Sequence, residues 1–229
     1  MRRETLIAIA AGGVSALLTL SVATGSVASV FFVYLAPLPL MIVGLGFGSR
    51  MVIIAAASGA VAAFATNGLL AALFYTLING LPAVLVARQA LLSRVYEDEN
   101  GETIIDWYPP GPILAMLAAM GATLLLVAAL LTSGSEGGIE GVIGATLSEG
   151  FAAMAPQLSD EERSSIIKIL VPGFPAAVAV SWLVMTVING VLAQWVLSRS
   201  EKALRPSPIM ADFDLPSWSS WALVGAGEA

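Results

Sequence analysis

The chain has 229 residues, of which 58% are hydrophobic and only 11% are charged. Because soluble domains carry about a quarter charged residues, this composition excludes an ordinary soluble globule and indicates a protein of the lipid bilayer. The net charge is −6, and no basic segment is extensive enough to bind nucleic acid, which is therefore not expected as a partner. The absence of cysteine and histidine excludes disulfides, Cys/His zinc sites and any catalytic triad that uses imidazole.

The hydrophobic segments predict an all-α, polytopic membrane bundle of about six transmembrane helices. A span needs roughly 20 apolar residues to cross about 30 Å of hydrocarbon. The segments without charge that reach or approach this length are residues 5–23, 27–47, 51–65, 69–87, 113–131 and 175–197. The third is short, so it is expected either to tilt little or to extend into Thr66 and Asn67. Together they predict a membrane domain over residues 1–205. The first segment could instead be a cleaved signal peptide, although its apolar run of 18 residues favours a retained span.

Lysine and arginine residues orient the predicted helices. If the amino terminus is cytoplasmic, only Arg163 and Lys168 lie outside the membrane. The inner segments then carry Arg2, Arg3, Arg50, Arg88, Arg94, Arg199, Lys202 and Arg205. This distribution obeys the positive-inside rule at every loop. We therefore expect a protein of the bacterial cytoplasmic (inner) membrane, with its N-terminus and C-terminus both cytoplasmic.

The inner loop over residues 88–110 contains an acidic run that is expected to form a solvated turn. Trp107 and Tyr108 follow it and are expected to anchor the next span at the membrane interface. Beyond the last span, residues 206–229 are expected to form a cytoplasmic segment that leads to a further, truncated span. Trp218 and Trp221 begin an apolar run there, and this run is too short to cross the membrane.

Residues 133–173 are expected to form an outer-face insert of short amphipathic helices. The first helix is predicted by an apolar stripe at steps of three or four residues: Ile139, Ile143, Leu147, Phe151, Met154 and Leu158. Ser159 and Glu162 have the spacing of a capping box, in which each side chain satisfies a backbone N–H of the first helical turn. They predict a second helix that runs through Leu170.

Two asparagines inside predicted spans are the most informative polar residues, because hydrocarbon offers their amides no partner. Asn79 ends the sequence Thr-Leu-Ile-Asn, and Asn189 ends the similar sequence Thr-Val-Ile-Asn; glycine follows each of them. On one interpretation, both asparagines line a shared solute pocket with Tyr75 and Thr186. On the other, they only form hydrogen bonds that hold helices together.

The second predicted span carries Tyr34, Pro37 and Pro39 near its middle. Proline lacks a backbone donor, so these residues leave carbonyl groups of the preceding turn without a regular partner. Broken helices at mid-membrane depth can line substrate sites in transporters. The alternative is a simple kink. The candidate solute site therefore comprises Asn79, Asn189, Tyr75, Thr186, Tyr34, Pro37 and Pro39.

Small residues recur every four positions in the first and third predicted spans. They are Ala8, Gly12 and Ala16 in the first, and Ala55, Gly59 and Ala63 in the third. This spacing gives a flat helix face on which a neighbouring backbone can approach closely. We expect the first and third spans to pack tightly against each other.

Enzymatic chemistry is not expected. Acidic residues lie only outside the predicted spans, no serine has an evident base, and no residues are expected to bind a metal or cofactor. Residues 44–48, Gly-Leu-Gly-Phe-Gly, follow a membrane helix and lack the strand that a dinucleotide site requires. No phosphate-binding loop is present, so the chain has no ATPase of its own.

Several motifs resemble the YybS-like family, a bacterial membrane protein family of unknown function. They are residues 34–39 (YLAPLP), 44–48 (GLGFG), 80–83 (GLPA), 107–109 (WYP) and 215–218 (LPSW). The family is distantly similar to the S components of energy-coupling-factor transporters, which bind vitamins and use a separate ATPase module. The resemblance implies a small-solute-binding, transporter-type module that relies on other membrane or ATPase subunits. The alternative is a non-transporting membrane scaffold or envelope-associated protein.

Overall fold

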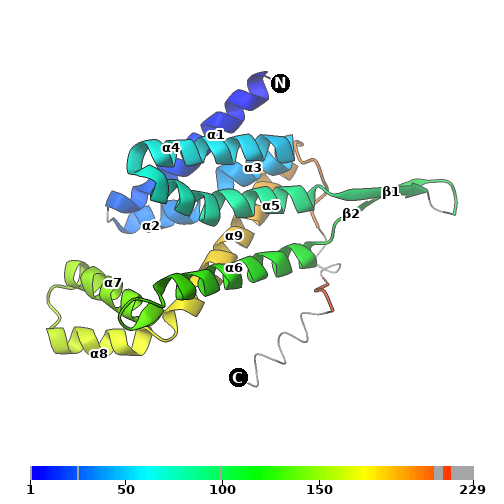
Figure 1. Cartoon of the computed structure of the whole chain (residues 1–229). Coiled ribbons are helices and arrows are strands. Elements are labelled where there is room, and N and C mark those ends of the chain that lie inside the picture. Colours follow the sequence, from blue (N-terminus) through cyan, green and yellow to red (C-terminus); the bar gives the residue numbers. More distant parts are fainter. Residues whose placement is uncertain (1, 25, 98, 209–213, 218–229) are drawn as a thin grey trace. The chain divides into compact units, whose positions relative to one another are not determined.

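A computed structural model describes residues 2–24, 26–97, 99–208 and 214–217 (Figure 1). Its elements in chain order are α1 (Arg2–Leu20), η1 (Ser21–Thr24), α2 (Val27–Tyr34), α3 (Leu38–Phe47), α4 (Ser49–Tyr75), η2 (Thr76–Gly80), α5 (Leu81–Ala90), β1 (Ser93–Glu97), β2 (Thr103–Trp107), α6 (Pro110–Thr132), α7 (Gly138–Met154), α8 (Asp160–Leu170) and α9 (Phe174–Arg199). In this part of the chain, five helical runs are long and apolar enough to cross a membrane. The prediction of a helical membrane bundle is confirmed; the number of crossings stays a prediction.

The chain divides into two compact units. We call Met1–Met116 with Met185–Ala229 the large unit, and Leu117–Val184 the small unit. Trp218 and Trp221 lie outside the described residues, so the further span expected after residue 205 stays a prediction.

In the large unit, α1 packs along α4 through the small residues predicted for this contact. All six are buried. A Cβ atom added to Gly12 would collide with Ala55 O and Ser58 Oγ. The close approach also lets Ser58 Oγ donate a hydrogen bond to Ile9 O at 3.2 Å. The predicted tight contact between the first and third spans is confirmed.

The helical run from Ser49 to Ala90 turns back on itself at Gly68, where φ is 78° and ψ is −169°. Gly59 and Tyr75 lie on either side of this reversal. In one straight helix they would be about 24 Å apart at 1.5 Å per residue. They are instead in contact, because a Cβ atom on Gly59 would meet the Tyr75 ring. The third and fourth predicted spans are therefore two helical arms that lie side by side (Figure 1).

The inner loop differs from the expected turn, since β1 and β2 form an antiparallel hairpin in which Val95 pairs with Ile105. The all-α prediction was wrong for this segment. The sequence contains the signal for a hairpin: Asn100-Gly101 stands between Val95-Tyr96 and Thr103-Ile104-Ile105, residue types that favour strands. Gly101 has a φ of 78°, a conformation that glycine adopts without steric cost.

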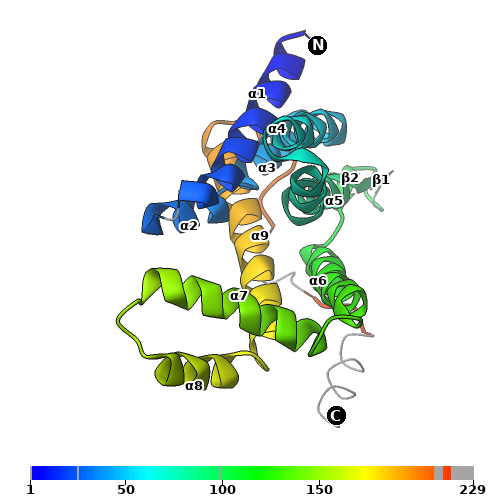
Figure 2. The same cartoon turned by 60° about the vertical axis from the view of Figure 1, so that its left-hand side comes forward.

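The small unit contains α7 and α8, which pack against each other (Figure 2). On α7, Ile139, Ile143, Leu147 and Phe151 of the predicted stripe are all half-buried, whereas Leu158 lies beyond the end of the helix at Met154. The side chain of Met154 lies outside the described residues.

The predicted capping box at the start of α8 is also confirmed. The Ser159 N–H donates to Glu162 Oε2 at 2.9 Å, and the Glu162 N–H donates to Ser159 Oγ at 3.3 Å. These bonds and one from the Ser159 hydroxyl stabilise the carboxylate, so they lower the pKa of Glu162. The helix ends at Leu170, as predicted.

After α9, the chain folds back along the large unit and buries Arg205. Its guanidinium Nη1 donates to Ala90 O at 2.9 Å and to Tyr108 O at 3.2 Å. Among the described residues no carboxylate lies within ion-pair distance of it, and burial lowers the pKa of Arg205. The neighbouring Leu204 N–H donates to Leu45 O at 3.4 Å. This segment therefore joins the ends of α3 and α5 and the chain just before α6.

Candidate functional site

The second predicted span is broken between α2 and α3, at the position where the prolines were expected to interrupt it. Pro37 and Pro39 cannot donate to the carbonyls four residues earlier. Val33 O and Leu35 O accept shorter-range bonds instead, from the N–H groups of Ala36 and Leu38, at 3.1 Å each. Because the Leu38 N–H is used in this way, Tyr34 O is left for a partner from another helix.

Asn189 of α9 supplies that partner. Its Nδ2 atom donates to Tyr34 O and to Met185 O, at 2.7 Å each. The side chain is 1% exposed, and its Oδ1 atom has no hydrogen-bond donor among the described residues. The acceptor Asn189 Oδ1 therefore lies unpaired beside the broken helix. Its surroundings are apolar, and the sequence from Thr5 to Phe47 contains no charged residue.

A second side chain bonds the break from α1. Ser15 Oγ donates to Ala36 O at 2.6 Å and accepts a bond from the Tyr75 hydroxyl at 2.9 Å. Both side chains are buried. Tyr75, which the sequence singled out, thus reaches the broken helix through Ser15, which the sequence analysis missed. The available signal was a polar residue next to the small residues Gly12 and Ala16 of α1.

Asn79 lies in η2, a single π-helical turn in which the Leu81 N–H bonds Thr76 O, five residues earlier. Pro82 explains this widening, because proline cannot donate to the carbonyl four residues before it and its ring crowds that group. Asn79 is buried, and its Nδ2 atom donates to Thr19 Oγ1 on α1 at 3.4 Å. Such π turns occur frequently at functional sites.

The structure brings the predicted site residues into two sets. Tyr75 and Asn79 bond side chains of α1, whereas Asn189 bonds the backbone at Tyr34. Within the described part of the chain, no hydrogen bond joins Asn79 to Asn189. The shared pocket stays a prediction.

The other predicted residues differ in burial. Thr186 is buried one turn before Asn189 on α9, and Pro37 is buried at the break. Pro39 is half-buried, and the Tyr34 side chain is 43% exposed although its carbonyl faces Asn189. The Tyr34 contribution to the site is therefore its backbone and not its phenol.

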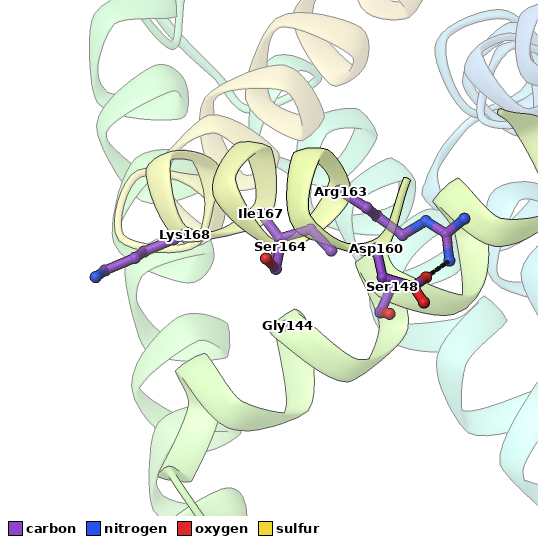
Figure 3. Close-up of a pocket in the computed structure, with 7 residues that line it drawn as sticks. All are labelled: Gly144, Ser148, Asp160, Arg163, Ser164, Ile167 and Lys168. Carbon is purple, nitrogen blue, oxygen red and sulfur yellow. Dashed lines mark hydrogen bonds and ion pairs between the residues drawn. The ribbon is translucent and has the colours of Figure 1, made fainter. Parts of the chain in front are cut away.

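The small unit has a hollow of about 440 Å³ between α7 and α8 (Figure 3). Its lining residues are Gly144, Ser148, Asp160, Arg163, Ser164, Ile167 and Lys168. Arg163 Nη1 lies 3.4 Å from Asp160 Oδ1, so the carboxylate of Asp160 already offsets the charge of Arg163. The Lys168 side chain points away from the other labelled residues. This open hollow offers less for specific recognition than the buried break in the large unit.

Comparison with known proteins identifies no relative, since no protein-family model, no curated protein and no solved structure matches this chain.

Proposed function

We propose that this chain is a multi-pass inner-membrane module that binds a small solute at the α2–α3 break and performs no chemistry on it. The observation that carries the proposal is the buried Asn189 Oδ1, an acceptor without a donor beside a broken helix. Leaving such an atom unpaired costs about 1–3 kcal/mol, so a bound donor would be stabilised there.

The surroundings of Asn189 define the class of solute. An amide oxygen accepts hydrogen bonds, so the solute presents an N–H or O–H group. The spans around the break contain no acid or base to neutralise an ion, and burying an unpaired charge is costly. We therefore expect an uncharged, hydrogen-bond-donating solute. Energy for its movement would come from separate membrane or ATPase subunits, as the resemblance to the YybS-like family implies.

The proposed topology has six crossings and both termini in the cytoplasm. The reversal at Gly68 supports separate third and fourth crossings. The contacts of Arg205 and Leu204 support it too, because they join ends of α3, α5 and α9 that are all predicted to lie inside. Since the chain has no native thiol, Ser135→Cys should react with an impermeant maleimide from outside. Ser93→Cys should react only after permeabilisation; the reverse pattern would refute this topology.

The binding site is tested by screening uncharged solutes against the purified protein in detergent, with thermal stabilisation as the readout. Asn189→Leu should abolish the stabilisation by any solute found, because it removes the acceptor. Asn189→Asp, which keeps an oxygen of similar placement, should retain part of it. Asn79→Leu is the matched control, since Asn79 bonds α1 and should not be needed. Equal binding by wild type and Asn189→Leu would contradict the proposal.

The second candidate function is a non-transporting scaffold. The hydrogen bonds through Ser15 favour it, because they use the Tyr75 hydroxyl and Ala36 O to hold helices together. On this alternative, no solute stabilises the protein and Asn189 serves only to bond Tyr34 O. The same screen distinguishes the two functions.

A further inference from the structure

The hairpin of β1 and β2 is a two-stranded sheet with no further strand on either side within the described residues. Figure 1 shows it extending beyond the end of α5. A two-stranded hairpin is marginally stable in water, and its unpaired edges are templates for another strand. The segment is therefore incomplete as an isolated element.

Both faces of the hairpin present apolar side chains to solvent. Residues that pair directly lie on the same face, so Val95 and Ile105 share one face while Tyr96 and Ile104 share the other. Val95 is 65% exposed and Ile105 is 52% exposed. Polar residues lie on both faces as well, since Arg94 and Asp106 share the face of Tyr96 and Thr103 shares the face of Ile105. The exposed apolar pair in the middle of each face nevertheless indicates a surface that a partner covers.

The charge of the hairpin selects the kind of partner. Between Val95 and Ile105 the sequence contains only acidic charges and no lysine or arginine. Anionic lipid headgroups and nucleic acid would be repelled by this segment, whereas a basic peptide would be attracted. The two edges also differ, because β1 contains Arg94 whereas β2 contains Asp106 and no cation.

The register shows which backbone groups are free at the β2 edge. Tyr108 N–H donates to Leu92 O at 2.9 Å, which continues the pairing by one residue beyond Ser93 and Trp107. Hydrogen-bonded pairs alternate in an antiparallel ladder. The N–H and C=O of Val95 and Ile105 therefore point outward, each toward its own edge.

We propose that the β2 edge is a docking site for an extended, lysine- or arginine-rich segment of another protein, which adds a third strand beside Ile105. Backbone bonds to the outward groups of Thr103 and Ile105 supply affinity, and the acidic charge of the hairpin supplies selectivity. With the proposed topology, this partner is cytoplasmic. The inference concerns a different part of the molecule from Asn189 and does not depend on solute binding.

The test uses the 229-residue chain in detergent and ten-residue fluorescent peptides that alternate valine or isoleucine with lysine. Fluorescence anisotropy is the readout. Ile105→Pro removes the outward N–H of β2 without removing a ladder bond. It should weaken peptide binding by about tenfold. Val95→Pro makes the matching change at the β1 edge and should leave binding within about twofold.

Peptides with glutamate in place of lysine should bind at least about tenfold more weakly, and added salt should reduce that difference. The proposal is overturned if wild type binds no basic peptide, or if both proline variants or neither of them lose binding. It is also overturned if anionic vesicles bind the hairpin more tightly than the basic peptides do.

Discussion

The segments at residues 76–80 and 186–190 share four of their five residues, yet they have different local structures. The first is the π turn η2, and the second lies within the continuous helix α9. Asn79 makes one long bond of 3.4 Å to a side chain of α1. Asn189 makes two bonds of 2.7 Å to backbone carbonyls. Nearly the same motif therefore bonds a side chain at residue 79 and the backbone of a broken helix at residue 189.

The residue three positions after each asparagine accounts for the difference in the backbone. Pro82 follows Asn79, whereas Leu192 occupies the equivalent position after Asn189. Proline withdraws one helical donor, and the turn widens so that the Leu81 N–H reaches Thr76 O. Leucine permits the regular ladder. The contact with α2 accounts for the rest, because the break after α2 releases Tyr34 O and Asn189 bonds it.

Placing proline at the equivalent position of α9 should give the largest effect. Leu192→Pro should destabilise the protein by about 3 kcal/mol, since it removes a backbone bond and crowds the preceding turn. Leu192→Ala is the control for the lost side chain. Unfolding in mixed micelles with increasing dodecyl sulfate measures both. Equal losses in the two variants would show that Pro82 does not by itself explain η2.

Removing the asparagine that bonds the broken helix should have the next largest effect. Asn189→Leu should cost about 1–3 kcal/mol in the same unfolding assay, because Tyr34 O is left buried without a donor. Asn67→Leu is a suitable control, since Asn67 is exposed at the reversal of the chain, and it should change stability by less than about 0.5 kcal/mol. If both variants lose a similar free energy of unfolding, the bond from Asn189 to Tyr34 O does not stabilise the fold.

Asn79→Leu should have a smaller effect, about 0.6 kcal/mol, which is typical of a hydrogen bond between membrane helices. The double variant with Asn189→Leu sharpens the comparison. If the asparagines act in separate contacts, their effects add within about 0.5 kcal/mol. A larger coupling energy would instead favour the shared pocket predicted from the sequence.

The smallest effect is expected at the capping box of α8. This helix lies outside the two compared segments, residues 76–80 and 186–190, and so serves as a reference. Its bonds lower the pKa of Glu162, so they stabilise the helix above the pKa that the residue has in the unfolded chain. This contribution is lost as the pH falls through the lower pKa of the folded state. Carbon NMR of the Glu162 carboxyl should show that Ser159→Ala raises its pKa. An unchanged value would contradict the role of Ser159.

Much of the fold could be predicted from local patterns. Runs of uncharged residues predicted the helices, Pro37 and Pro39 predicted the break, and the spacing of small residues predicted the contact of α1 with α4. The hairpin was missed, although Asn100 and Gly101 are a recognised turn signal. The acidic charge of residues 97–102 does not distinguish a solvated turn from a hairpin, because both expose such residues to water.

The sequence by itself determined where helices form, where they break and which of their faces are small enough to meet, because backbone donors and side-chain volumes are local properties. Only the tertiary structure decided that Ser15 connects Tyr75 to the break and that Asn189 bonds Tyr34 O. These partners are far apart in the chain, since Tyr34 and Asn189 are separated by 155 positions. Which released carbonyl meets which amide depends on how the helices pack, and a local pattern contains no information about that pairing.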